Sequence, residues 1–349
     1  MLKILDIAKP GAIAAAIAVT AWSGQASADT VWRYSSWLPP QHIYQSEVIE
    51  SWIADVERVT EGRVKIEVLP KTVGTAPAQY DVLRDGLADV STVVPGYTPG
   101  RFDAFGLGEV PLVSPDTRYG SVAFQTFYNK HLAPLNMFDG VHVLSAFTTS
   151  PGQVFTVSKP VREIADFHGL KFRSPVTTTM ESLPAVGAVP MQKPVPELYE
   201  LLAGGVLDGT LAGVDQARGF RLSEVTKNLT LIPGGFYSSV MLLMINEDSW
   251  NRISEDDRKA IETVSGEVFA EQVGEAFAKE IEAGIADMKE KGGTVIEASP
   301  EFVDDLREAL QPVEAAALEK AKAAGVADPA AALQDLRDEV EKRRQALAR

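Results

Sequence analysis

An arginine near the middle of the chain is the residue whose type and setting best suit binding chemistry. Arg173 ends the short run Lys171-Phe172-Arg173, and Pro175 two residues later stops the chain from continuing as a helix. A guanidinium is permanently charged and presents a planar fork of N–H donors, so it binds both oxygens of a carboxylate more selectively than a lysine does. The alternative is an edge-strand arginine that pairs with a surface acid. The run therefore indicates a candidate anion site at Arg173.

Residues from distant parts of the chain are candidates for the rest of the same site. His42 lies in the first loop expected on the ligand side, and Asp215 either lines the site or ends the strand that follows Asp208-Gly209. Five aromatic residues could supply an apolar wall, with core packing as the alternative for each: Trp37, Tyr97, Phe155, Phe236 and Tyr237. These residues can form one binding site only if the fold brings their separate loops together.

The elements that would position these residues alternate between strand and helix. Strands are expected at residues 31–35, 64–69 and 90–94, separated by helices with apolar residues at helical spacing. Such a βαβαβ start predicts an α/β domain whose ligand site lies beyond the carboxyl ends of the strands. The pattern then repeats, with further strands expected at residues 141–147, 154–157, 171–173 and 240–245, and long charged helices expected from residue 255 onward.

The first residues have the features of an export signal. Lys3 and Lys9 precede an alanine-rich apolar stretch that is too short to span a bilayer, and Ala26-Ser27-Ala28 then forms a small-residue cleavage site. We therefore expect residues 1–28 to be removed as a signal peptide, so that the mature chain begins at or near Asp29. A retained membrane anchor is the weaker alternative, because no other apolar segment of spanning length follows.

Composition narrows the possible functions. The net charge is −15, and it becomes −16 without residues 1–28, which carry two lysines and one aspartate. An acidic surface does not favour nucleic acid or anionic lipid as a partner, so an anionic ligand would need local positive charge. The chain has no cysteine, which excludes thiolate metal sites, thiol nucleophiles and disulfides. The four histidines show no ligand spacing, and no P-loop, complete dinucleotide fingerprint or serine elbow occurs. Neither a metal nor a cofactor is expected.

Five short sequence segments, called phrases below, occur in the same order as in a known protein family. Their residues are 37–42 with 61–70, 85–90 with 95–102, 166–175, 187–191 with 196–199 and 205–209, and 244–246 with 250–258. Together they resemble the periplasmic solute-binding proteins of TRAP transporters (tripartite ATP-independent periplasmic transporters), the DctP-like family. The third phrase contains Gly169-Leu170-Lys171-Phe172-Arg173, and the resemblance implies that Arg173 binds the carboxylate of the ligand.

The resemblance implies a fold, a function and a location. The expected fold is α/β, a two-domain periplasmic binding protein clamp with an interdomain cleft and a long helix that spans both domains. Domain I would comprise residues 29–150 and 240–285, and domain II residues 151–239 and 286–349. The protein would be exported to the periplasm, bind a small organic acid in the cleft and deliver it to the membrane permease subunits. It would be neither an enzyme nor embedded in the membrane itself.

The chain departs from the family pattern in ways that bear on the ligand. Many members carry a second arginine on the strand before the signature phrase, but residues 148–155 contain none and place Gln153 and Phe155 there instead. Ala212 stands at or near a position where other members have asparagine, close to Thr210. Gln153 and Thr210 complete the candidate set. One strong cation and a more apolar wall favour a monocarboxylate with an uncharged or aromatic body over a diacid.

Two other functions remain compatible with the sequence. The same fold can serve as a ligand sensor for a signalling receptor, which the absence of adjacent permease genes would favour. A secreted hydrolase on an α/β scaffold would require a nucleophile and a base that the sequence does not show.

Overall fold

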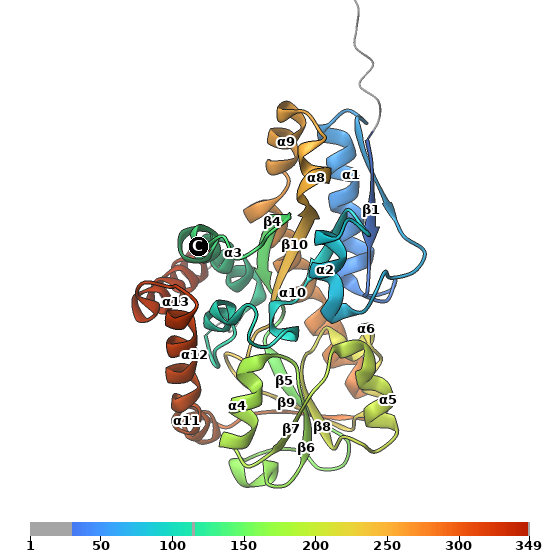
Figure 1. Ribbon diagram of the computed structural model, residues 1–349. Helices are drawn as coiled ribbons and strands as arrows, with labels where there is room; N and C mark the ends of the chain where they lie inside the picture. Colours follow the sequence, from blue (N-terminus) through green and yellow to red (C-terminus); the bar gives the residue numbers. More distant parts are fainter. Residues whose placement is uncertain (1–29, 114–115, 348–349) are drawn as a thin grey trace, which may run out of the picture.

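Two mixed β-sheets, each flanked by helices, form the framework of the computed structural model (Figure 1). The structure describes residues 30–113 and 116–347. The expected signal peptide and the expected mature N-terminus at Asp29 lie outside the described residues. Two α/β units joined by a long helix confirm the fold class predicted from the sequence.

The first sheet has five strands in the order β2-β1-β3-β10-β4. The strands are β1 (Thr30–Ser35), β2 (Val64–Val68), β3 (Val90–Val93), β4 (Val141–Thr148) and β10 (Val240–Asn246). The first three are parallel, whereas β10 runs antiparallel to β3 and β4. Its short helices are η1 (Tyr44–Ile49), α1 (Glu50–Val59), η2 (Ala76–Ala78), α2 (Gln79–Arg84), η3 (Pro95–Tyr97), η4 (Asp103–Gly108), α3 (Thr117–Phe127), η5 (Tyr128–Leu132), η6 (Ala133–Leu135), α8 (Glu247–Asn251) and α9 (Glu255–Glu262).

The second sheet has six strands in the order β11-β9-β5-β8-β6-β7. The strands are β5 (Gly152–Thr156), β6 (Lys171–Ser174), β7 (Val189–Gln192), β8 (Gly209–Gly213), β9 (Asn228–Leu231) and β11 (Thr294–Glu297). Its helices are η7 (Ile164–Phe167), α4 (Thr177–Ala185), η8 (Val195–Glu197), α5 (Leu198–Ala203), α6 (Gln216–Gly219), α7 (Leu222–Val225) and α11 (Pro300–Ala309). The chain passes between the sheets after β4 and again before β10, so the loops of both sheets meet near these two passages.

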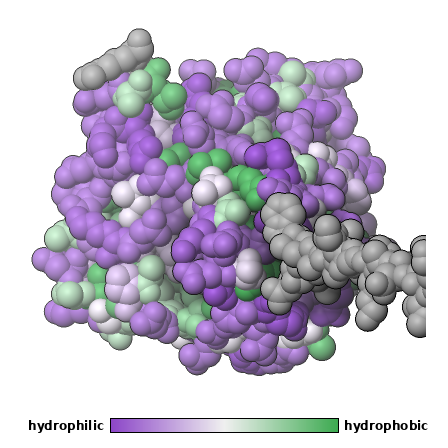
Figure 2. Space-filling view, turned by 90° about the horizontal axis from the view of Figure 1, so that it is seen from above, coloured by the Kyte–Doolittle hydropathy of each residue, from purple (hydrophilic) through white to green (hydrophobic). Residues whose placement is uncertain are grey.

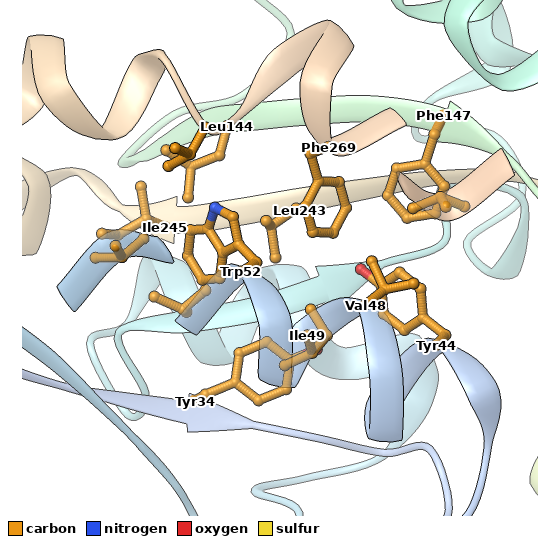
Figure 3. Packing of buried hydrophobic residues seen from close by; sticks show 14 of the residues in the cluster. Tyr34, Tyr44, Val48, Ile49, Trp52, Leu144, Phe147, Leu243, Ile245 and Phe269 are labelled. Atoms are coloured by element: carbon orange, nitrogen blue, oxygen red, sulfur yellow. The ribbon is translucent and has the colours of Figure 1, made fainter. Parts of the chain in front are cut away.

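Large aromatic side chains fill the core between the first sheet and the helices that cover it. Figure 3 shows Trp52 of α1 pointing toward Leu243 and Ile245 of β10 and toward Phe269. The indole of Trp52 is fully buried and lies edge-on to the Phe269 ring, 6.2 Å between centroids. Its Nε1 donates a hydrogen bond to Ser265 Oγ at 3.2 Å, so the buried polar atom has a partner.

One helix contacts both halves of the protein. Helix α10 (Gly266–Glu290) packs on α3 and β4 of the first half and on α6, α7 and β11 of the second. Long charged helices were expected from residue 255 onward, and in the structure a short helix, α9, ends at Glu262 before α10 begins at Gly266. Gly266 has a φ of +56°, outside the right-handed helical region, which breaks the helix at this point.

The last two helices of the chain pack mainly on the first half of the protein. The sequence prediction placed all of residues 286–349 in domain II, and β11 and α11 do pack there. Helices α12 (Gln311–Ala323) and α13 (Pro329–Leu347) instead turn back and pack on η4 and α3, as Figure 1 shows along one side of the molecule. Buried residues such as Ala317 and Leu336 belong to the same core cluster as Phe124 of α3. An amphipathic pattern predicts that one face of a helix is buried, but it does not predict which part of the protein that face packs against.

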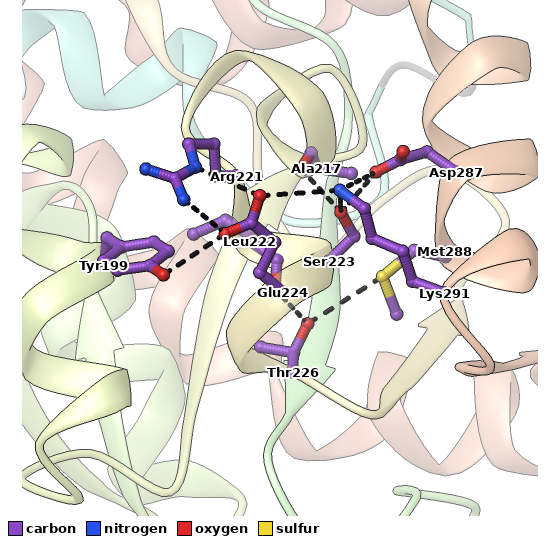
Figure 4. Close-up of polar contacts among 10 residues, drawn as sticks. All are labelled: Tyr199, Ala217, Arg221, Leu222, Ser223, Glu224, Thr226, Asp287, Met288 and Lys291. Atoms are coloured by element: carbon purple, nitrogen blue, oxygen red, sulfur yellow. Dashed lines mark hydrogen bonds and ion pairs between the residues drawn. The ribbon is translucent and has the colours of Figure 1, made fainter.

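Polar contacts hold α10 against the second half. In Figure 4, Lys291 donates to Ser223 Oγ at 3.2 Å and pairs with Asp287 at 3.2 Å, and the Ser223 hydroxyl also donates to Asp287. Arg221, which directly precedes the short helix α7, forms an ion pair at 2.6 Å with Glu224 of that helix. These groups anchor the C-terminal end of α10 to the loops that follow β8.

The surface is largely polar where Figure 2 shows it. The face drawn in Figure 2 is mostly hydrophilic, and its hydrophobic patches are small and scattered. No helix within the described residues combines the length and apolar character that crossing a membrane requires.

Candidate ligand-binding site

A cavity of about 30 Å³ lies between the two halves, where loops from both sheets meet. The first half contributes the loops after β1 and β3, the second half contributes β6 and the loop after β8, and α10 forms part of the wall. The lining residues are Trp37, Leu38, His42, Val94, Tyr97, Thr149, Arg173, Val195, Asp215, Gln216, Phe220, Tyr237, Ser239, Met241 and Phe277. The position beyond the carboxyl ends of the parallel strands is where α/β folds bind ligands.

Arg173 is the cation of this cavity. It lies on β6 and is only 1% exposed. Its Nε donates to the carbonyl oxygen of Lys193 at 2.8 Å, and its Nη1 donates to that of Leu211 at 3.1 Å. These bonds fix the guanidinium but leave its charge uncompensated, because no carboxylate of the described residues forms an ion pair with it. A buried cation without a counter-charge is costly, which makes this position a ready-made site for an anion.

Two phenols line the cavity with Arg173. The hydroxyl oxygen of Tyr97 accepts a hydrogen bond from the backbone N–H of Val195 at 3.3 Å, which links the two halves of the protein. Burial raises the pKa of Tyr97 and that of Tyr237, although the nearby charge of Arg173 acts in the opposite direction. Both groups are therefore neutral at physiological pH, and each has a hydroxyl hydrogen to donate.

A buried histidine and aspartate meet in the same cavity from opposite halves. His42 Nε2 lies 3.4 Å from Asp215 Oδ2, and the two side chains are 4% and 2% exposed. The backbone N–H of Tyr44 donates to His42 Nδ1 at 3.2 Å, so the ring hydrogen is on Nε2 and faces the aspartate. The Ser150 hydroxyl donates to Asp215 Oδ1. In a catalytic triad the serine would instead bond to the histidine, so this arrangement does not activate Ser150 as a nucleophile.

Apolar side chains complete the wall. Trp37 is held by a hydrogen bond from its Nε1 to the carbonyl oxygen of Thr92 at 2.8 Å and lies edge-on to Tyr97, 6.1 Å between ring centroids. Phe220 and Phe277 pack against His42, with ring centroids 5.4 Å and 6.3 Å away. The cavity thus combines one cation, several hydrogen-bonding groups and an aromatic lining. Within the described ranges no cluster of three or more metal-ligating side chains occurs.

Six of the ten candidate residues line this cavity, and four do not. The six are Trp37, His42, Tyr97, Arg173, Asp215 and Tyr237. The side-chain oxygen of Gln153 accepts a hydrogen bond from the backbone N–H of Ile232 at 2.6 Å, and its Nε2 donates to the carbonyl oxygen of Ile232 at 3.4 Å. The hydroxyl of Thr210 donates to the carbonyl oxygen of Leu211 at 3.0 Å, and the side chain is fully buried in β8.

The other two misplaced candidates are core aromatics. Phe155 packs with Leu198 and Leu202 of α5, and Phe236 packs against Phe167, with ring centroids 5.8 Å apart. Phe236 and Tyr237 lie in the irregular segment before β10, where the cavity is lined by Tyr237 and not by its neighbour Phe236. These four side chains do not line the cavity, and a role for them in ligand binding stays a prediction.

Sequence reasoning missed several lining residues. Phe277 lies in the middle of α10. Its spacing from the other apolar residues of the helix is that of an ordinary core residue, so nothing in the sequence indicated that it lines the cavity. Gln216 begins α6 directly after Asp215, and Phe220 follows the last residue of that helix. Both would have been candidates if the whole segment after β8 had been taken as a ligand-side loop. Thr149 and Ser239 lie where the chain passes between the sheets.

A second buried acid lies between the halves, next to the cavity. Glu109 is 1% exposed, and its Oε1 accepts from the backbone N–H of Val240 at 3.5 Å. Its own carbonyl oxygen accepts from the Thr178 hydroxyl at 3.2 Å, and Gln192 Nε2 donates to the carbonyl oxygen of Gly96 at 3.0 Å nearby. Burial raises the pKa of the Glu109 carboxyl from 4.5 to about 8.

This pKa predicts a pH dependence of stability. Above pH 4.5 the carboxyl ionises in the unfolded chain, while the folded protein keeps its proton up to about pH 8. Stability from this group is therefore complete below pH 4.5 and is lost as pH rises toward 8. We expect Glu109→Gln to raise the free energy of unfolding by about 1–3 kcal/mol at pH 8 and to change it little at pH 4.

Denaturant titrations at several pH values measure this effect. Glu181→Gln is the matched control, since Glu181 is partly exposed on the neighbouring helix α4 and pairs with Lys320. Equal stability of wild type and Glu109→Gln at pH 8 would contradict the assigned protonation.

Two α/β domains around a cavity with converging polar groups define a solute-binding protein of the clamp type. The profile of the family described as "Bacterial extracellular solute-binding protein, family 7", DctP, matches residues 34–321. The chain belongs to this family, the solute-binding proteins of TRAP transporters, as the five sequence phrases implied.

Related proteins of known structure bind aromatic acids. A TRAP periplasmic solute-binding protein from Bordetella bronchiseptica with bound (R)- and (S)-mandelate is 34% identical, with a TM-score of 0.86 over 90% of this chain and 99% of that one. A marine metagenome TRAP solute-binding protein specific for aromatic acid ligands, in complex with metahydroxyphenylacetate, is 27% identical, with a TM-score of 0.84 and coverage of 90% and 99%. The outer membrane transporter protein TsaT of Comamonas testosteroni is 28% identical over 315 residues, 90% of this chain and 92% of that protein.

Proposed function

We propose that this protein is the periplasmic receptor of a TRAP transporter for an aromatic monocarboxylate. It binds the acid between its two domains and delivers it to the membrane permease subunits. It is exported by the signal peptide at residues 1–28 and catalyses no reaction. The observation that carries this proposal is the buried guanidinium of Arg173, which has no carboxylate partner among the described residues and lies in a cavity with aromatic walls.

The site residues have separate roles in this proposal. The carboxylate of the ligand binds the Arg173 fork, and the phenols of Tyr97 and Tyr237 donate to its oxygens. The ring of the ligand packs among Trp37, Phe220 and Phe277. The absence of a second arginine in residues 148–155 favours a single carboxylate. The acids bound by the two related structures support an aromatic body.

The size of the cavity implies that the domains move. A volume of about 30 Å³ is much smaller than the roughly 300–1,000 Å³ of most small-molecule sites. An aromatic acid therefore enters when the loops of the two domains are further apart, and the domains then close on it, with contacts such as Val195 to Tyr97 re-forming across the cleft.

A ligand panel tests the proposed function. We expect benzoate, phenylacetate or mandelate to raise the melting temperature of the mature protein, because a ligand at 100 times its Kd stabilises the folded state by about 2.7 kcal/mol. Benzyl alcohol, which has no carboxylate, and succinate, which has two and no ring, serve as controls and should cause no shift. A shift with succinate and none with the aromatic acids would contradict the proposal.

A further inference from the structure

We propose that Asp215, oriented by His42 and Ser150, is an acceptor subsite that selects aromatic acids carrying a hydroxyl group and excludes a second carboxylate. This inference rests on the proposed function and adds the specificity of the same cavity. Its basis is a buried carboxylate in the cavity wall, one oxygen of which has only one long contact among the described side chains.

The two oxygens of Asp215 have different partners. Oδ1 accepts the short hydrogen bond from the Ser150 hydroxyl. Among the residues that the structure describes, Oδ2 contacts only His42 Nε2, at 3.4 Å, which is longer than the 2.7–3.2 Å of a good N–H···O bond. An ionised carboxylate accepts about four hydrogen bonds, and a buried polar atom with unused capacity is costly. Oδ2 is therefore available to a donor from the ligand.

Because Arg173 and Asp215 carry opposite charges, the two ends of the cavity favour different groups of the ligand. Arg173 attracts an anion, whereas Asp215 is an acid in the same enclosed space. Like charges that approach within a few ångströms in a poorly solvated site repel strongly. A ligand with its carboxylate on Arg173 can thus place a hydroxyl hydrogen on Asp215 Oδ2 but not a second carboxylate.

Two glycines allow the subsite to form. A Cβ on Gly219 would lie 2.5 Å from His42 Cδ2, and a Cβ on Gly213 would lie 2.3 Å from Asp215 Oδ1. Any larger residue at either position would displace the histidine or the aspartate. Because His42 comes from the loop after β1 and Asp215 from the loop after β8, the subsite is complete only when the two domains are closed.

Calorimetric titration with three related acids tests the inference. Phenylacetate has no hydroxyl, mandelate adds one next to the carboxylate, and 3-hydroxyphenylacetate adds one on the ring. We expect wild type to bind at least one hydroxylated acid about tenfold or more tighter than phenylacetate. In Asp215→Asn, which removes the charge of the acceptor and keeps its shape, that advantage should fall to threefold or less, while phenylacetate still binds. The diacid 3-carboxyphenylacetate should bind Asp215→Asn more tightly than it binds wild type.

Asp335→Asn is a matched control. Asp335 forms a similar pair with His131, 2.9 Å from Nε2, but on α13 and outside the cavity. It should keep the wild-type ratios. If Asp215→Asn does not fold, His42→Gln replaces it, because losing the histidine misplaces the same oxygen and should also reduce the hydroxyl advantage.

The outcomes separate the two levels of the proposal. Equal binding of phenylacetate and both hydroxylated acids by wild type, or a hydroxyl advantage that survives in Asp215→Asn, would overturn the subsite and leave the proposed function standing. Failure of all the aromatic acids to bind wild type would overturn the proposed function, and the subsite with it.

Discussion

Replacing Arg173 by alanine is expected to weaken binding of the aromatic acid by roughly 30-fold to several-thousand-fold. Arg173 is 1% exposed, so the ion pair proposed between it and the ligand would be desolvated. Truncating one partner of such a pair costs about 2–5 kcal/mol, and each factor of ten in affinity corresponds to about 1.4 kcal/mol. Isothermal titration calorimetry with the best ligand of the panel measures the loss.

Two further variants separate geometry from charge. Arg173→Lys keeps the charge but loses the planar fork and the bonds to the carbonyl oxygens of Lys193 and Leu211, so it should recover only part of the lost affinity. Arg101→Lys is the control, because Arg101 forms a partly exposed bidentate pair with Asp81 at 3.0 and 2.9 Å and does not line the cavity. It should leave affinity nearly unchanged.

Circular dichroism must accompany these titrations, since a buried arginine with two backbone partners also contributes to folding. If Arg173→Ala stays folded and binds within about threefold of wild type, Arg173 does not hold the carboxylate. The ligand would then be bound elsewhere or would not be an acid.

Replacing Trp52 by alanine should lower the free energy of unfolding by about 3–5 kcal/mol, the usual cost of truncating a large buried aromatic residue. The indole is fully buried in the core that Figure 3 shows. Its removal leaves a cavity beside Phe269 and also leaves the Ser265 hydroxyl without its donor. Urea denaturation followed by circular dichroism measures the change.

Trp52→Phe and Val268→Ala are the controls for this prediction. Phenylalanine keeps part of the packing but loses the hydrogen bond to Ser265, so it should cost less than alanine. Val268 is 44% exposed on the same helix as Phe269, and its truncation should change stability by less than about 0.5 kcal/mol. A loss below 1 kcal/mol for Trp52→Ala would show that this core adjusts around the missing ring.

Much of the architecture could be predicted from the sequence because its signals are local. Alternating strand and helix patterns before residue 100 predicted β1, β2 and β3 and the helices between them, and a continuous apolar run predicted β10. Arg173 was identifiable because its type, the short strand before it and the proline after it are adjacent in the chain. The ordered phrases that surround it indicated the family, which the match over residues 34–321 shows.

Other features depended on contacts between segments that are far apart in the chain. Helices α11, α12 and α13 follow one another in the chain, yet α11 packs on the second half, α13 packs on the first, and α12 contacts both through Val313 and Ala317. Phe236 and Tyr237 are adjacent aromatics, and only the local course of the backbone before β10 decided which one lines the cavity.

The candidate subsite at His42 and Asp215 also depends on contacts between distant segments. His42 and Asp215 were each candidates from the sequence, but nothing in it indicated that they pair. Their contact needs the loops after β1 and β8 to approach and needs glycine at positions 213 and 219 to leave room. Residue types and short-range spacing thus determined the elements, the family and the cation. The tertiary structure alone decided which side chains share the cavity, because burial and charge pairing depend on neighbours that the order of residues does not specify.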